Sequence, residues 1–123
     1  MKLLIVTAAL FTSLGASAAG LPCTIHPQKG MADTELAKLA KVSRADAEST
    51  ALKAVHIKSA AVASGELEAE GGCLIYSFDI QIPGKKSIVE VAVDAGTGKV
   101  LARKHEGPKA QAAEKAADAA VNK

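Results

Sequence analysis

The sequence predicts an α+β fold in which one main helix packs on a four-stranded antiparallel sheet. Apolar residues recur at helical spacing over residues 43–56 and then alternate with polar ones, with a period of two, from residue 60 to residue 106. Glycine-containing turns divide the alternating part into four runs, and strands joined by short turns pair antiparallel. We therefore expect one domain over residues 43–106, preceded by a short helix and followed by an alanine-rich tail.

Residues 1–18 have the three parts of a secretory signal peptide. Lys2 supplies the positive start, Leu3–Leu14 the apolar run, and Ala16-Ser17-Ala18 the small residues of a cleavage site. The apolar run has about twelve residues, fewer than the roughly 20 that a membrane-spanning helix needs. We therefore expect a periplasmic or secreted protein whose signal is removed and which keeps no stable membrane anchor.

Residues 19–42 are predicted to form an N-terminal extension that contains a short helix. The first part is rich in proline, glycine and polar residues and should run as an extended segment. Residues 33–40 can form the helix, with acidic residues at its start and Lys38 near its end, as the helix dipole prefers. Its apolar residues, Leu36, Leu39 and Ala40, share one face.

The main helix is predicted to begin at Ser43, whose hydroxyl can cap free backbone amides of the first turn. Asp46, three residues later, makes a weak capping box with it. His56 lies near the C-terminus, where the helix dipole favours a positive charge. The predicted buried stripe consists of Ala47, Ala51, Leu52 and Val55.

The first strand is predicted to be half-buried, because Leu67 and Ala69 alternate with three glutamates that form an acidic outer face. Gly65 inside this run indicates a bulge. Gly71-Gly72 is predicted to be a two-residue hairpin turn, since glycine adopts positive φ without strain. The glutamates are Glu66, Glu68 and Glu70.

The second strand has the most apolar face and is therefore predicted to be central. Pro83-Gly84 turns the chain into the third strand, and residues 94–98 form the turn before the fourth strand, Val100–Glu106. The tail over residues 107–123 is predicted to be a fraying helix or disordered, because isolated helices of about fifteen residues are marginal in water. The predicted inward residues are Leu74, Tyr76, Phe78, Ile80 and Ile82 in the second strand and Val89, Val91 and Val93 in the third, where Ile88, Glu90 and Ala92 face outward.

Two cysteines, Cys23 and Cys73, are present in a chain predicted to enter an oxidising compartment. An even number of cysteines after export favours a disulfide. A bond between them would stabilise the fold by about 4 kcal/mol in the chain-entropy model. A free thiol, an intermolecular bridge and a redox role are the alternatives.

The composition argues against nucleic-acid binding. The formal net charge of the whole chain is +2. Removal of the signal would remove the positive charge of Lys2 and leave a net charge of about +1. A nearly neutral chain is not a general binder of nucleic acids or anionic membranes. With one tyrosine, two phenylalanines and no tryptophan, it also lacks an aromatic platform for single strands.

The ordered set of elements resembles the PepSY family, found in propeptides of thermolysin-type metallopeptidases, in a spore-germination protein and in many small secreted bacterial proteins. The resemblance runs from about residue 41 to residue 106. Its most specific part is a strand ending in Asp-Ala-x-Thr-Gly before a final strand, here within Val89–Leu101. The other matching segments are Val42–Ala47 at the start of the helix, Gly65–Glu68 in the first strand and Leu74–Ile80 in the second.

The resemblance implies a binding domain without catalytic residues, often proposed to restrain peptidases, because the propeptide versions inhibit and help to fold their own enzymes. The sequence departs from the family pattern in two places. The link from His56 to Ala63 is longer than usual, and Cys73 replaces a polar or charged residue. The second departure indicates a local staple rather than a site common to the family.

We expect no catalytic residues, no cofactor and no metal site. Three histidines and several serines are present, but nothing in the sequence places them together. The acidic outer face, to which Asp79 and Glu90 also belong, could attract a cation, although solvated surface charges explain it equally well. Cys23 and His26 have metal-ligand spacing, but they lack the second pair that a structural zinc site requires.

The predicted functional surface is the edge of the sheet, where an extended peptide can add through main-chain hydrogen bonds. Our first hypothesis is a non-enzymatic binding protein that restrains a peptidase or engages another envelope protein. The alternative is a structural or stress-related envelope protein with weak ligand or cation binding and no protease partner, and the sequence leaves the oligomeric state open. The candidate edge residues are Val100, Leu101, Ala102, Arg103 and Lys104.

Overall fold

A computed structural model describes residues 23–121 of the chain. The predicted signal peptide, residues 1–18, lies outside the described residues. Within them, no helix is long and apolar enough to cross a membrane. The elements, in chain order, are α1 (Asp33–Leu39), α2 (Arg44–Val55), β1 (Ala61–Glu70), β2 (Cys73–Gln81), β3 (Ile88–Asp94), β4 (Val100–Glu106) and α3 (Pro108–Val121).

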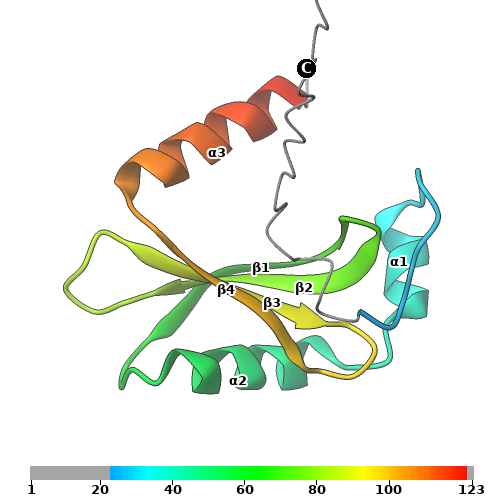
Figure 1. The fold of residues 1–123 in the computed structure, drawn as a ribbon, viewed down its shortest axis with the longest axis horizontal. Coiled ribbons are helices and arrows are strands. Elements are labelled where there is room, and N and C mark those ends of the chain that lie inside the picture. Colours follow the sequence, from blue (N-terminus) through cyan, green and yellow to red (C-terminus); the bar gives the residue numbers. More distant parts are fainter. Residues whose placement is uncertain (1–22, 122–123) are drawn as a thin grey trace, which may run out of the picture.

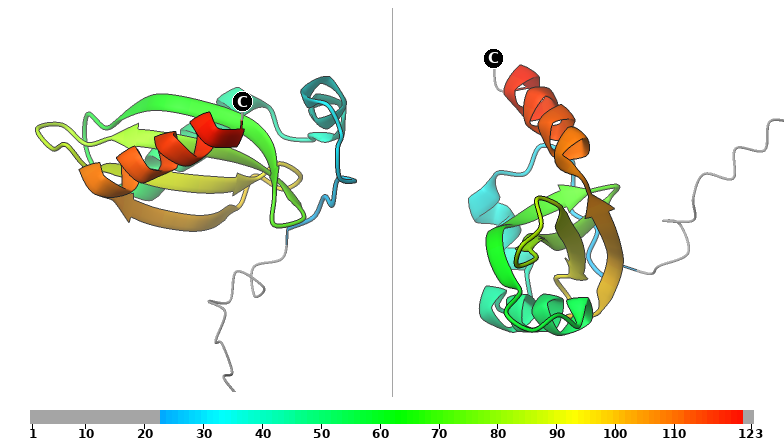
Figure 2. Two further views of the ribbon diagram at one scale, coloured as in Figure 1. Left: turned by 90° about the horizontal axis from the view of Figure 1, so that it is seen from above. Right: turned by 90° about the vertical axis from the view of Figure 1, so that its left-hand side faces the viewer.

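The four strands form one antiparallel sheet in the order β1-β2-β3-β4 (Figure 1). The predicted α+β class and the antiparallel four-stranded sheet are therefore confirmed. β2 occupies an interior position, as its apolar sequence predicts, and β1 and β4 are the edges on opposite sides of the molecule (Figure 2). Gly71 and Gly72 have φ of 57° and 79°, which accounts for two glycines in the tight β1–β2 turn.

Helix α2 lies along one face of the sheet and packs through its smallest side chains. Ala47 and Ala51 are fully buried, and their small size allows the helix backbone to approach the strands closely. The Ser43 hydroxyl accepts a hydrogen bond of 3.1 Å from the Asp46 amide, which is the predicted cap. The helix ends at His56, which takes the left-handed conformation with φ of 55°.

The core lies between α2 and the sheet. Phe78 is fully buried at its centre, and burying such a side chain stabilises a fold by about 1.5–3 kcal/mol. Tyr76 is buried beside it and donates a hydrogen bond of 2.7 Å to the Val42 carbonyl, which satisfies its only polar group. The buried residues of this cluster are Leu36, Ala47, Ala51, Leu74, Tyr76, Phe78, Ile80, Ile82, Val89, Val91, Val93 and Ala95.

The prediction of a bulge at Gly65 is wrong by two positions. The register of β1 against β2 shifts between Val62 and Ser64, so the extra residue is Ala63. Gly65 has a different reason to be glycine: a Cβ atom there would lie 2.6 Å from Cδ1 of the Phe78 ring. The glycine therefore makes room for the largest fully buried side chain rather than for a bend.

The face of the sheet opposite α2 is only partly exposed to solvent. Ile75 and Ile88 lie on that face and are 5% and 7% exposed, although alternation assigns Ile88 to the outer side. Helix α3 lies on this side of the sheet, with α2 on the other (Figure 1). Two hydrogen bonds from the Gln111 side chain, to the carbonyls of Lys86 and Glu106, hold its first turn.

Candidate functional site

The N-terminal segment Cys23–His26, here called the strap, is attached to one end of the sheet. A disulfide joins Cys23 to Cys73 at the start of β2, with 5.8 Å between their Cα atoms and a sequence separation of 50. The Leu74 amide also donates a hydrogen bond of 2.9 Å to the Ile25 carbonyl. The structure thus contains the intramolecular bridge that the even cysteine count favours.

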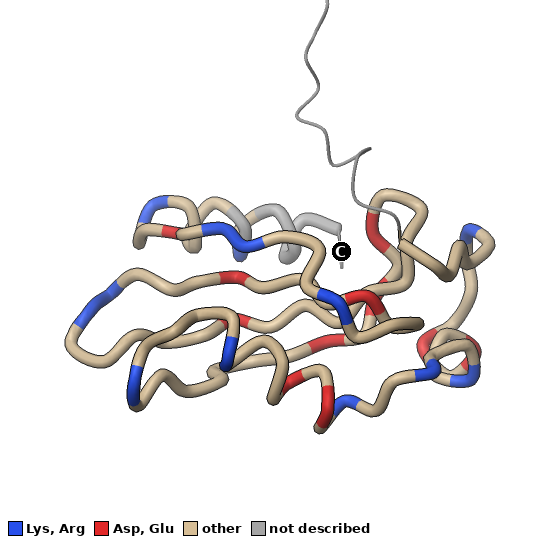
Figure 3. The backbone as a smooth tube through the Cα atoms, turned by 60° about the horizontal axis from the view of Figure 1, so that its bottom comes forward, with Lys and Arg blue, Asp and Glu red and all other residues tan. Residues whose placement is uncertain are grey.

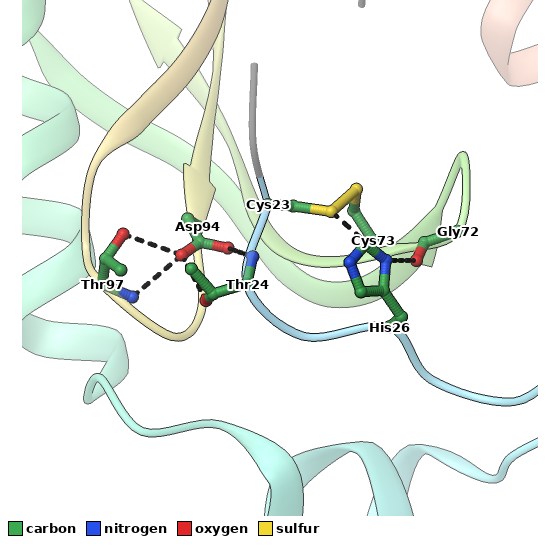
Figure 4. The surroundings of a disulfide bond; sticks show 7 residues. All are labelled: Cys23, Thr24, His26, Gly72, Cys73, Asp94 and Thr97. Carbon is green, nitrogen blue, oxygen red and sulfur yellow. Dashed lines mark hydrogen bonds between the residues drawn. A yellow bond between two sulfur atoms is a disulfide. The ribbon is translucent and has the colours of Figure 1, made fainter. Parts of the chain in front are cut away.

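Asp94, the last residue of β3, holds the strap from the other side (Figure 4). Its carboxylate is fully buried and accepts hydrogen bonds from the Thr24 amide and hydroxyl, at 3.2 and 2.7 Å. It also accepts bonds from the Thr97 amide and hydroxyl, at 2.9 and 2.7 Å. Burial alone would raise the pKa of Asp94, but these donors outweigh it and hold the pKa below its usual range.

The turn that follows Asp94 is a meeting point for three distant segments. The Ala95 carbonyl accepts hydrogen bonds from the amides of Lys41 and Val42, and the Ala95 amide donates to Leu74. A side chain at Gly96 would overlap Thr24, and Gly98 has φ of 76°. Packing and hydrogen bonding therefore explain the Asp-Ala-Gly-Thr-Gly sequence.

His26 lies between the disulfide and the β1–β2 turn. Its Nδ1 atom is 3.0 Å from the Gly72 carbonyl oxygen and 3.6 Å from Cys23 Sγ. The possible ligand atoms of Cys23, His26 and Cys73 all lie within 4.8 Å of one another. From the sequence alone, only Cys23 is near His26. Cys73 joins them in the structure because the fold brings β2 beside the strap.

The predicted acidic face is present on the side of the sheet away from α2, and Figure 3 marks the acidic positions along the strands. Partial burial first, and then the neighbouring carboxylates of Glu70, Glu66 and Glu90, together raise the pKa of Glu68 to about 7. The row is therefore a group of surface acids whose negative charges repel one another.

The predicted edge residues Val100, Leu101, Ala102, Arg103 and Lys104 all lie in β4. Val100 and Leu101 are half-buried, whereas the other three are exposed. The register shifts between Ala92 and Val93 of β3, which leaves Leu101 as the extra residue of β4. The guanidinium of Arg103 donates to the Ala54 carbonyl of α2 and so fixes this strand to the helix.

The three histidines lie on separate elements: His26 on the strap, His56 at the end of α2 and His105 in β4. The fold therefore brings together the strap residues and Cys73, whereas the edge residues form a separate surface.

Comparison with protein families gives one match. The family model described as "Peptidase propeptide and YPEB domain", or PepSY, matches residues 41–104, which is more than half of the chain. The chain belongs to the PepSY family. No curated protein and no solved structure matches it. The PepSY match contains α2, β1, β2 and β3 and most of β4, whereas the strap with Cys23 and His26 lies before it.

Proposed function

We propose that this PepSY protein is a non-enzymatic binding module, periplasmic or secreted, that restrains a peptidase through the free edge of β4. The observation that carries the proposal is the position of β4 at the end of the sheet order, with one side paired to β3. An extended segment of a partner can add to such an edge by main-chain hydrogen bonds, and side chains on both faces then provide specificity.

The side chains of β4 suit this role. Ala102 is small and exposed, so a partner strand can approach it. The contact of Arg103 with Ala54 holds the strand in place before binding. A strand that is already ordered loses less conformational entropy on association, which favours affinity.

The test is the hydrolysis rate of a thermolysin-type peptidase titrated with the protein from Ala19 onward. Saturable inhibition, with the added protein remaining intact, is the expected result. Ala102→Lys should weaken inhibition, because a charged side chain on an edge strand opposes pairing. Ala61→Lys makes the same change at an exposed alanine of the other edge strand, β1, and should leave inhibition unchanged. Equal loss in both variants would argue against the β4 edge.

A second candidate is a structural or stress-related envelope protein that binds a cation or ligand weakly and has no protease partner. The row of neighbouring acids around Glu68 is the observation that favours it. An unchanged hydrolysis rate at micromolar excess of the protein would move the choice to this candidate. Melting that is insensitive to a chelator would then count against its cation-binding form.

A further inference from the structure

We infer that Cys23, Cys73 and His26 form a metal site when the disulfide is reduced, and that the ion it takes is thiophilic: zinc(II) or copper(I). The inference is independent of the edge-strand function. It rests on the fold bringing three possible ligand atoms within 4.8 Å of one another from two segments distant in sequence. The disulfide then acts as a gate that closes the site on oxidation.

The ligand chemistry fits these ions. Thiolate and imidazole are the donors that zinc and copper(I) prefer, whereas hard ions such as magnesium and calcium prefer oxygen. Zinc–sulfur and zinc–nitrogen bonds of about 2.3 and 2.0 Å place ligand atoms roughly 3.5–4 Å apart in a tetrahedral site. Nδ1 of His26 is already 3.6 Å from Cys23 Sγ, which lies within this range, and reduction allows the two sulfur atoms to separate from each other.

The strap keeps its place without the disulfide. Asp94 accepts two hydrogen bonds from Thr24, next to Cys23 in the chain, and the Ile25 carbonyl accepts one from Leu74, next to Cys73. These bonds hold the two cysteines beside each other after reduction. The fold therefore holds the ligands in place before the ion binds, and the ion does not have to assemble the site from an unfolded chain.

A dithiol can serve as the reductant that opens the Cys23–Cys73 disulfide. The dithiol transfers two electrons and two protons to the Cys23–Cys73 bond, which becomes two thiols, while the dithiol itself becomes a disulfide. Binding of the ion then displaces one proton from each thiol, because the thiolate is the metal ligand. Exchange with an oxidised dithiol reverses the reduction: its disulfide takes up the two electrons and becomes two thiolates, the Cys23–Cys73 bond forms again, and the ion loses both thiolate ligands and is released.

The ion can reach the site from solvent, because His26 and Gly72 are exposed and both cysteines are only half-buried. Coordination through Nδ1 requires His26 to give up its contact with the Gly72 carbonyl. Water can replace that contact at the exposed turn. Three protein ligands leave a fourth position for water or another molecule, as in the open zinc sites of enzymes.

The test uses the protein from Ala19 onward, reduced with a phosphine, desalted without oxygen and titrated with zinc(II) and, separately, with copper(I), each against a chromophoric chelator. The reduced protein should bind one equivalent of one ion, and the oxidised protein none. His26→Ala should weaken binding by more than the roughly 10–100-fold that follows the loss of an outer-shell partner, because it removes a direct ligand. His105→Ala removes an exposed histidine of β4 and should leave binding unchanged.

A Cys23→Ser/Cys73→Ser variant that binds as tightly as the reduced protein would overturn the inference. So would equal binding by the His26→Ala and His105→Ala variants, or no binding of either ion. Circular dichroism of the reduced protein completes the test. Loss of the sheet signal on reduction would also overturn the inference, because the ligands meet only in the folded chain.

Discussion

Two buried carboxylates at different ends of the sheet differ in how completely their oxygen atoms are hydrogen-bonded. Asp94 is fully buried beside the strap, and four hydrogen bonds from Thr24 and Thr97 satisfy it. Glu106, at the end of β4 beside α3, is 3% exposed and has an ion pair of 3.4 Å with the exposed Lys104. Its second oxygen, Oε2, is buried and has no hydrogen-bond partner within the described part of the chain.

The comparison separates a firmly held region from a loosely held one. A buried charge costs several kcal/mol unless donors replace the water that it loses. Donors surround Asp94, so its burial fixes the strap, the turn and β2 in one arrangement. Glu106 lacks such donors within the described residues, and the Gln111 side chain anchors the first turn of α3 beside it. We expect opening to begin at α3 and the strapped end to be the last part to unfold.

The largest effect is expected from removing the disulfide at the firm end. Cys23→Ser/Cys73→Ser should lower the free energy of unfolding by about 4 kcal/mol, because the unfolded chain regains the freedom of a long loop. Urea denaturation of the variant and of the oxidised protein measures this difference. A loss below about 1 kcal/mol would mean that hydrogen bonds alone hold the strap, and the contrast between the two ends would rest on Asp94.

The same chemical change at the two carboxylates tests the comparison directly. Asp94→Asn should lower the free energy of unfolding by about 2–3 kcal/mol, because an amide nitrogen cannot accept from the threonine donors. Glu106→Gln should change it by less than about 1 kcal/mol, since removal of the buried charge offsets the lost ion pair. Similar losses in the two variants, measured by urea denaturation at pH 7, would contradict the distinction.

Acid should weaken the firm end specifically. The pKa of Asp94 is lowered in the folded state, so its contribution to stability is present above the unfolded pKa of about 3.9 and is lost as pH falls through the folded value. The unfolding free energy of the unmodified protein should therefore decline below about pH 4 more steeply than that of Asp94→Asn. Parallel curves for the two proteins would show that other groups dominate acid unfolding.

A smaller effect of opposite sign is expected on the acidic face. The pKa of Glu68 is raised to about 7 in the folded state, so ionising this carboxyl destabilises the fold. The destabilisation is absent below the ordinary pKa of 4.5, grows as the pH rises, and is complete above about pH 7. Glu68→Gln should raise the free energy of unfolding by about 1 kcal/mol at pH 8, after allowance for solvent screening, and by nothing at pH 4. Glu48→Gln, on α2, is the matched control, and an equal gain there would contradict the assignment.

The smallest effect on global stability is expected at α3. Gln111→Ala should lower the free energy of unfolding by less than about 1 kcal/mol, because two hydrogen bonds from an exposed part of the molecule are lost, one to the Lys86 carbonyl and one to the Glu106 carbonyl. Hydrogen exchange of the amides of α3 should nevertheless become faster, while exchange in β2 stays unchanged. Faster exchange in both elements would show that α3 and the sheet open as one unit.

Local patterns in the sequence were enough to predict the sheet and its turns. Alternation specifies which residues of β2 and β3 face α2, and paired glycines specify the tight turn at residues 71–72, because both effects act between near neighbours. The Ser43 cap is equally local. The bulge at Ala63 was missed, and Gly65 was interpreted wrongly, because the bulky neighbour of Gly65 is Phe78 on another strand.

By itself, the sequence determined the α+β class, the antiparallel order of the strands and the family, since these follow from periodicity and from a contiguous motif. The cysteine count favoured a disulfide but left its partner open. Only the tertiary structure decided that Asp94 binds Thr24, that Cys73 lies beside His26, and that Glu106 is buried without a full set of partners. Each of these depends on contacts between segments far apart in the chain, whose distances are set by folding and not by spacing in sequence.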